Sequence, residues 1–211
     1  AAGSVVMSHA QMPGGQPDVT QQQTYMLHRA SSADSTGRNA DFKTVPPGAT
    51  VTVLDTDGPG VISHIWFTIN DQEPYHLKRI VLRIYWDGEQ TPSVEAPIGD
   101  FFGLGLGAYH SWQSQMLSVS SVKALNSYFP MPFARHARIT VTNEGEQAIN
   151  SLYYNIDYRG TSRPLPPDTL YFHAQYHQAQ PNHGWTSDWK TNGQPSINTK
   201  PNLMGEDNYV W

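Results

Sequence analysis

The sequence predicts an all-β protein whose strands form a jelly-roll β-sandwich, with few or no helices. Segments rich in β-branched and aromatic residues recur at intervals of roughly 8–15 residues, with clusters of Gly, Pro, Asn and Asp between them. Several segments alternate apolar and polar residues with a period of two, and none shows a convincing period of 3.6. Short strands spaced in this way are typical of a sandwich or a jelly roll.

The predicted strands begin at residue 50. The first covers residues 50–55, and the second covers 61–69 after the turn signal Gly58-Pro59-Gly60. The third, residues 80–86, runs into Asp87-Gly88, a strong hairpin signal, so residues 91–96 are expected to return beside it. Further strands are expected at 116–120, 126–129, 137–143, 151–158 and 169–176.

Two of these segments alternate clearly enough to predict which side chains face the core. Ile139 and Val141 are expected to point inward from their strand. Leu152, Tyr154, Ile156 and Tyr158 are expected to share one face of theirs.

The remaining segments predict the organisation of the chain. Residues 1–24 are polar and contain no periodicity, which indicates an N-terminal arm before a jelly-roll domain at 25–176. Residues 177–207 are expected to form a long loop. Residues 208–211 are expected to begin a strand that leads into a C-terminal part of the protein. Within the domain, residues 29–41 are dense in turn-formers and predict a loop, either purely structural or ligand-binding.

Composition excludes several classes of protein. Hydrophobic residues make up 38% of the chain, aromatic residues 11% and charged residues only 15%, which argues against disorder and against a helical protein. A net charge of -5 with scattered basic residues does not suit nucleic acid. No run of 18 apolar residues is present, so no membrane span is expected.

The start of the sequence and its lack of cysteine bear on location and chemistry. Ala1-Ala2-Gly3 is the small-residue start that signal-peptidase cleavage leaves, so we expect an exported protein in the periplasm, at the cell surface or outside the cell. The absence of Cys excludes disulfides, thiolate metal sites and a cysteine nucleophile.

Neither a metal site nor a cofactor is expected. His173 and His177 are four residues apart, a spacing that suits a helix, but in a strand it separates them by about 13 Å. The glycine-rich stretch 103–107 lacks the strand–loop–helix context of a dinucleotide site, and its glycines fit tight packing at a sheet corner. No Gly-x-Ser-x-Gly motif marks a serine nucleophile.

Aromatic and polar residues at the expected strand ends point to carbohydrate instead. Sugar rings stack their apolar faces on Trp and Tyr, and their hydroxyls pair with Asp, Asn and Arg. The segments 64–66 and 100–102 combine such groups, although burial in the core is the simpler explanation of Trp66 and Phe102. A glycosidase also needs two carboxyl groups, and the 18 Asp and Glu residues offer many pairs without indicating one.

Several of these segments resemble a bacterial enzyme family, glycoside hydrolase family 172. The Ser/Asp/Gly/Asn-rich loop at 29–41 is similar to the family's amino-terminal motif, and the resemblance covers roughly residues 25–211. The other resembling stretches are residues 58–68, 82–88, 92–103, 128–133 and 152–158.

The resemblance implies a protein of two jelly rolls that assembles as a trimer or hexamer and cleaves or rearranges furanosides. Its substrates would be fructofuranosides or arabinofuranosides, and its mechanism would be retaining, with one Glu as nucleophile and another as acid/base. The residues it implies for a sugar-binding pocket are Arg29, Asp34, Asn39, Asp41, His64, Trp66 and Asp100.

The catalytic Glu motifs of the family, Gly-Glu-Gly-Asp and Gly-Thr-Gly-x-Glu-Asp-Tyr, do not occur in this sequence. Residues 205–209 are superficially similar to the second motif, but their surroundings match a strand that precedes both motifs in the family. We therefore assign no catalytic residue. The catalytic pair is expected downstream of this chain or on a second chain that carries the C-terminal half.

Two alternatives remain open at this point. A non-catalytic carbohydrate-binding module would use exposed tryptophans, for which Trp112, Trp185 and Trp189 are candidates. A structural, self-assembling jelly roll would use the arm at 1–23 and the loop at 177–207 to clasp its neighbours.

Overall fold

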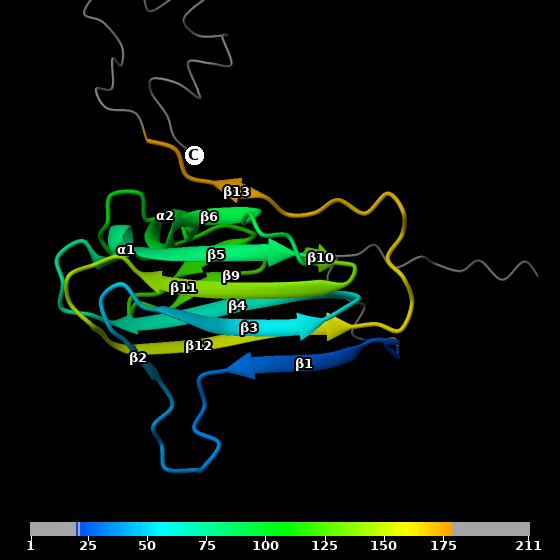
Figure 1. Ribbon diagram of the computed structural model, residues 1–211, viewed down its shortest axis with the longest axis horizontal. Helices are drawn as coiled ribbons and strands as arrows, with labels where there is room; N and C mark the ends of the chain where they lie inside the picture. The colour runs from blue at the N-terminus through cyan, green and yellow to red at the C-terminus, as the bar shows by residue number, and fades with distance from the viewer. Residues whose placement is uncertain (1–19, 21, 179–211) are drawn as a thin grey trace, which may run out of the picture.

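Two β-sheets pack face to face in the computed structural model, which describes residue 20 and residues 22–178 (Figure 1). The eight-stranded sheet has the order β1 (Met26–Ser31), β12 (Ile149–Gly160), β4 (Gly60–Asn70), β9 (Leu125–Ser127), β8 (Leu117–Val119) and β7 (Trp112–Gln113), with β10 (Met131–Phe133) paired to β4 and β2 (Lys43–Val45) paired to β12. The five-stranded sheet has the order β13 (Ala174–Gln175), β6 (Val94–Pro97), β5 (Ile80–Trp86), β11 (His136–Asn143) and β3 (Thr50–Asp57). β1 and β13 are edge strands, seen at the bottom and top of Figure 1.

The strand order is that of a jelly roll, so the predicted fold class is confirmed. The chain passes through eight main strands in the sequence β1, β3, β4, β5, β6, β9, β11 and β12. The first, eighth, third and sixth of these lie side by side in one sheet, and the fifth, fourth, seventh and second lie side by side in the other. This is the arrangement of two interleaved Greek keys, and it explains why sequence-distant strands are neighbours.

The core lies between the inner faces of the two sheets. Ile139 and Val141 are fully buried there, as their alternation predicts, and so are Leu152 and Ile156 of β12. The largest buried side chain, Trp86, donates its indole N–H to the backbone oxygen of Phe172 at 2.8 Å. Because its one polar atom has a partner, the ring is buried without an unmet hydrogen bond.

The predicted turn at Asp87-Gly88 is also present. Both residues have positive φ, 54° and 87°, and the N–H of Glu89 donates to the backbone oxygen of Trp86 at 3.0 Å. The return strand β6 begins at Val94, three residues later than predicted. The reason is that residues 87–93 form a longer connection than the two-residue hairpin that this dipeptide usually makes.

Some strand predictions are wrong in extent. Residues 29–31 do not belong to a loop, because they end β1, which pairs with β12 along its whole length. Most of the strand expected at 169–176 is irregular, and only β13 within it is paired. The strands β1, β2, β7 and β10 do not stand out in the sequence because they are short or lack alternation, and their pairing partners supply the order.

Among residues 22–178, helices are confined to two single turns, α1 (His76–Arg79) and α2 (Ile98–Phe101), which pack against each other and against β5 and β6. In the described part of the chain, no helix has the length and apolar character needed to cross a bilayer. Most of the predicted arm at 1–24, the loop at 177–207 and the strand at 208–211 lie outside the described residues, as do Trp185, Trp189 and the segment 205–209.

A bulge in β4 has the greatest consequence for the outer surface. Asp157 of β12 lies opposite His64, but the next residue, Tyr158, lies opposite Ile62, so Ser63 has no partner. The hydroxyl of Ser63 instead donates to the backbone oxygen of Asp157 at 3.3 Å. Bulges redirect side chains and are common beside functional sites. This one places Ser63 and His64 consecutively at the half-exposed surface.

Candidate functional site

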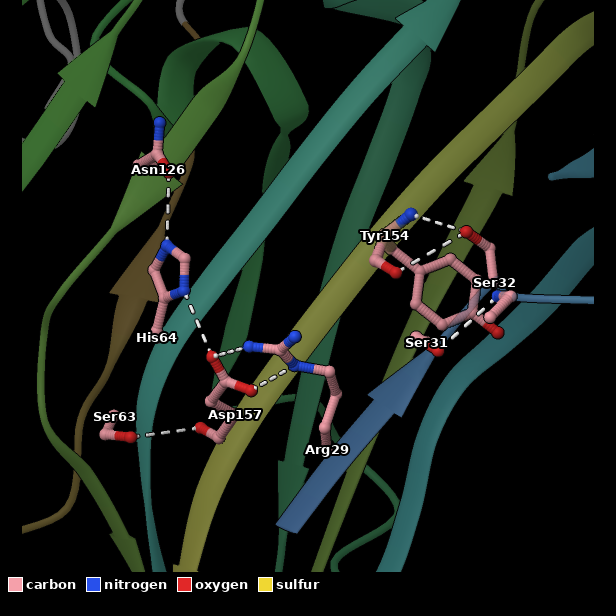
Figure 2. A network of polar contacts seen from close by, with 9 residues as sticks. Arg29, Ser31, Ser32, Ser63, His64, Asn126, Tyr154 and Asp157 are labelled. Atoms are coloured by element: carbon pink, nitrogen blue, oxygen red, sulfur yellow. Dashed lines mark hydrogen bonds and ion pairs between the residues drawn. The ribbon is translucent and has the colours of Figure 1, made fainter. Parts of the chain in front are cut away.

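Three neighbouring strands bring Arg29, His64 and Asp157 together on the outer face of the eight-stranded sheet (Figure 2). Asp157 of β12 lies opposite both Arg29 of β1 and His64 of β4. The guanidinium of Arg29 donates through Nε to Oδ1 at 2.6 Å and through Nη2 to Oδ2 at 3.0 Å, and Nδ1 of His64 lies 3.3 Å from Oδ2. A bidentate guanidinium fixes the plane of the carboxylate as well as its position.

The imidazole of His64 is held on its other sides by β9 and the residue that follows it. Nε2 lies 3.1 Å from Oδ1 of Asn126, and the ring stacks on Tyr128 with centroids 4.8 Å apart and planes within 7°. Figure 2 shows the imidazole lying between Asp157 and Asn126. Both ring nitrogens therefore face oxygen atoms, a pattern that suits a doubly protonated ring or a neutral ring with the Asn126 amide turned over.

The electrostatics of the cluster favour an ionised Asp157. Burial opposes the charge of this carboxyl, but the hydrogen bonds and charges of Arg29 and His64 outweigh it and hold the pKa of Asp157 below its usual value. The hydrogen bond to Asp157 in turn raises the pKa of Arg29. At neutral pH the carboxylate is thus an acceptor with no proton to give.

Trp66 extends this cluster along β4. It lies opposite Asn155 on one side and Asn126 on the other, and its side chain is half-buried. Phe102 is fully buried. The explanation of both aromatics as core residues therefore holds for Phe102, whereas Trp66 keeps part of its ring at the outer surface.

Asp34, Asn39 and Asp41 lie together in the loop that follows β1. The Asp34 carboxylate accepts the hydroxyl of Thr36 at 2.6 Å and its backbone N–H at 2.8 Å, and these bonds hold the pKa of Asp34 below its usual value. Oδ1 of Asp41 accepts the backbone N–H of Asp34 at 2.7 Å. Asn39 is exposed and adopts a left-handed conformation with φ of 65°. The two carboxylates make their hydrogen bonds within the loop and shape it.

Asp100 lies elsewhere, on α2. Its Oδ1 accepts the ammonium of Lys78 at 2.6 Å, and Lys78 in turn lies over the ring of Tyr176. Its Oδ2 is buried and has no hydrogen-bond partner within the described residues. Of the residues implied for a sugar pocket, Arg29, His64 and Trp66 share one face, three form the loop, and Asp100 belongs to neither group.

None of the described carboxyl groups with a clearly shifted pKa suits the role of a glycosidase's acid. Those whose pKa departs clearly from the usual value are Asp34, Glu73, Asp87 and Asp157, and every one of them is lowered. A general acid needs a raised pKa, so that it still carries its proton near neutral pH. Within residues 20 and 22–178, no three His, Asp or Glu side chains gather as they would around a metal ion.

Three residues of the cluster were not predicted as site residues from the sequence, namely Asp157, Asn126 and Tyr128. A signal for Asp157 exists, because inward-facing Tyr154 and Ile156 require the odd-numbered residues of this strand to face outward. Asn126 and Tyr128 belong to a short segment with no such alternation.

The sequence matches a known protein family over most of the strands that form this site. A family model described as GH172 domain-like matches residues 36–156, which is more than half of the chain. The chain belongs to this GH172 domain-like family. The resemblance found in the sequence is thereby confirmed, and it relates the protein to glycoside hydrolases. No curated protein matches the chain.

Proposed function

We propose that this chain is the jelly-roll part of an exported furanosidase-type glycoside hydrolase, retaining in mechanism and acting on fructofuranosides or arabinofuranosides. The observation that carries the proposal is the cluster of Arg29, His64 and Asp157 beside Trp66 on the outer sheet face of a GH172-family domain. The role proposed for this face is to bind sugar. The assembly is proposed to be a homo-oligomer, a trimer or hexamer.

The chemistry of the cluster suits a sugar ring. Trp66 and Tyr128 offer aromatic surface for the C–H face of a ring, and Asn126 and Asn155 offer amides for its hydroxyls. Arg29 is 59% exposed and binds Asp157 through only two of its three nitrogens, so it retains N–H groups for a ligand. The charges of Arg29 and Asp157 cancel, which suits a neutral ligand.

Bond cleavage is assigned to other residues. A retaining glycosidase places its two carboxyl groups about 5 Å apart and keeps one of them protonated. Because the family's catalytic Glu motifs do not occur in this sequence, we place the catalytic Glu pair downstream of this chain or on a second chain.

The test combines turnover and binding on the purified chain. Aryl arabinofuranosides and aryl fructofuranosides are expected to remain uncleaved, while the same compounds shift the indole signal of Trp66 in NMR spectra. Trp66→Ala should abolish binding, and Tyr75→Ala, which removes an aromatic ring that is 68% exposed elsewhere, should leave it unchanged. Turnover by the purified chain alone would contradict the placement of the Glu pair. Absence of any binding would contradict the proposed role of the sheet face.

A second candidate function rests on the sheet edge. β1 closes one side of the eight-stranded sheet with no neighbour beyond it in the described residues, and its Met26 and Leu27 are well exposed. Unprotected edges of this kind pair with other chains. A structural, self-assembling jelly roll would therefore grow through β1. Mass photometry separates the two candidates, because open polymers would favour this second function and a closed trimer or hexamer the first.

A further inference from the structure

One row of side chains crosses the outer face of the eight-stranded sheet from edge to edge. Trp66 of β4 lies directly opposite Asn155 of β12 on one side and Asn126 of β9 on the other. The row continues to Ser31 of β1 beyond Asn155, and to Ser118 of β8 beyond Asn126. Residues directly opposite in paired strands point to the same face. The order Ser-Asn-Trp-Asn-Ser is thus symmetric about the tryptophan.

The row ends on β7, where Gln113 lies opposite Ser118. Its six members are all uncharged, and all except Trp66 carry a hydroxyl or an amide as their polar group. Gln113 is exposed, and the other five are half-buried, as expected for side chains that stand upright on an open sheet.

Most of the polar atoms in the row are unused. Within the part of the chain that the structure describes, the side chains of Trp66, Asn155, Ser118 and Gln113 make no hydrogen bond. The row therefore presents donors and acceptors to whatever lies against it. The other two members are only lightly engaged: Ser31 accepts the backbone N–H of Ala33 at 3.4 Å, and Asn126 meets His64.

The spacing of the row sets the shape of its ligand. Neighbouring strands lie about 4.8 Å apart, so the five steps from Ser31 to Gln113 span about 24 Å. One step is comparable with the length that one ring adds to an extended glycan, and each ring brings hydroxyls to both sides of its plane. A protein surface with a donor or acceptor at every step matches such a repeat.

We infer that this row is a binding track for a neutral oligosaccharide of about five sugar rings, laid across the strands with its central ring on Trp66. This inference rests on the proposed function and specifies its ligand as a glycan chain rather than a single sugar. The absence of charge from the row excludes the acidic glycans, which would need cationic partners along their length.

Isothermal titration calorimetry with oligosaccharides of defined length tests this inference. The probes are α-1,5-linked arabino-oligosaccharides and inulin-type fructo-oligosaccharides of one to six rings. The dissociation constant is expected to fall at least tenfold between one ring and about five rings, and to level off beyond that length.

Variants at different places in the row sharpen the test. Trp66→Ala should weaken every length at least tenfold, because the central stack is common to all of them. Gln113→Ala, at the end of the row, should weaken only the probes of five and six rings, by about threefold to tenfold for one lost hydrogen bond. Tyr75→Ala serves as the control and should match the wild type. Circular dichroism confirms that each variant is folded.

The outcomes separate this inference from the proposed function. Equal affinity for one ring and for six would overturn the track and leave a single-sugar site, with the proposed function intact. No binding by any probe would overturn both. If Trp66→Ala changes the molar mass in solution and not the affinity for glycan, the face holds a second copy of this chain, and the track is overturned.

Discussion

Replacement of Asp157 by Asn removes the anion that joins β1, β4 and β12, while preserving the size of the side chain. In the wild type this carboxylate accepts two hydrogen bonds from Arg29 and one from His64. The amide that replaces it would keep one acceptor and turn a donor toward groups that are themselves donors. We expect D157N to fold and to be less stable.

The size of the effect follows from exposure. Arg29 is 59% exposed, so solvent screens its pair with Asp157, which is then worth about 0–1 kcal/mol. His64 is only 25% exposed, and its hydrogen bond to Asp157 is long at 3.3 Å, so this bond adds about 0.5–1.5 kcal/mol. The free energy of unfolding should therefore fall by about 0.5–2.5 kcal/mol in total, which lowers the melting temperature by about 2–4 °C for each kcal/mol.

The effect must also depend on pH. Because the pKa of Asp157 is lower in the folded protein, its contribution is complete above the usual Asp value of about 3.9 and is lost as the pH falls through the lowered value. Urea unfolding of both proteins at pH 7, 5 and 3 measures this directly. The wild type should lose its advantage as the pH drops below about 4.

A matched control is Asp55→Asn, which breaks a 2.8 Å contact with His136 on the other sheet. Asp55 is 59% exposed, so the change in unfolding free energy should stay within about 0.5 kcal/mol. If D157N were as stable as the wild type at pH 7, the cluster would not hold the three strands together. An equal loss at pH 7 and pH 3 would mean that the charge of Asp157 is not what matters.

Two further outcomes are expected. A Cβ at Gly60 would lie 2.6 Å from the buried ring of Phe133, so Gly60→Ala should lower the free energy of unfolding by about 1–3 kcal/mol, whereas Gly105→Ala, which meets nothing closer than 3.8 Å, should be nearly neutral in thermal melts. Equal melting temperatures for the two variants would contradict the packing described. Burial, with a smaller contribution from the Asp71 carboxylate, raises the pKa of Tyr109 to about 12. The difference in tyrosinate absorbance between wild type and Tyr109→Phe should therefore titrate with a midpoint near 12, and a midpoint near 10 would contradict this pKa. Stability linked to this phenol is complete below about pH 10 and is lost as the pH rises toward 12.

Much of the fold was predictable because its central strands carry their burial pattern in the sequence. The prediction of residues 61–69 and 80–86 matches β4 and β5 to within a residue, since both are long and rich in β-branched and aromatic side chains. β1 could not be found in this way, because its six residues pair with β12 without alternating burial. The bulge at Ser63 was equally hidden, since a pattern of side chains does not show where one strand gains a residue over its partner.

The candidate site was predictable in its parts and not in its assembly. The resemblance named Arg29, His64 and Trp66, but their common face depends on register with a strand whose Asp157 lies 128 positions beyond Arg29 and 93 beyond His64. The sequence did not predict that Asp100 lies away from these three residues. Its position depends on the packing of α2 against α1, and single-turn helices are too short to show a periodic pattern.

The cluster of Arg29, His64 and Asp157 also joins β1, the first strand of the domain, to β12 and β4. β1 is an edge strand that pairs only with β12, over six residues. Its local unfolding would break this pairing and leave the other strands of the sandwich paired. A molecule that binds Arg29 of β1 and Asp157 of β12 at the same time would hold these two strands together. Ligand binding would therefore first reduce the local opening of β1 at the edge of the sheet, before it changes the stability of the core.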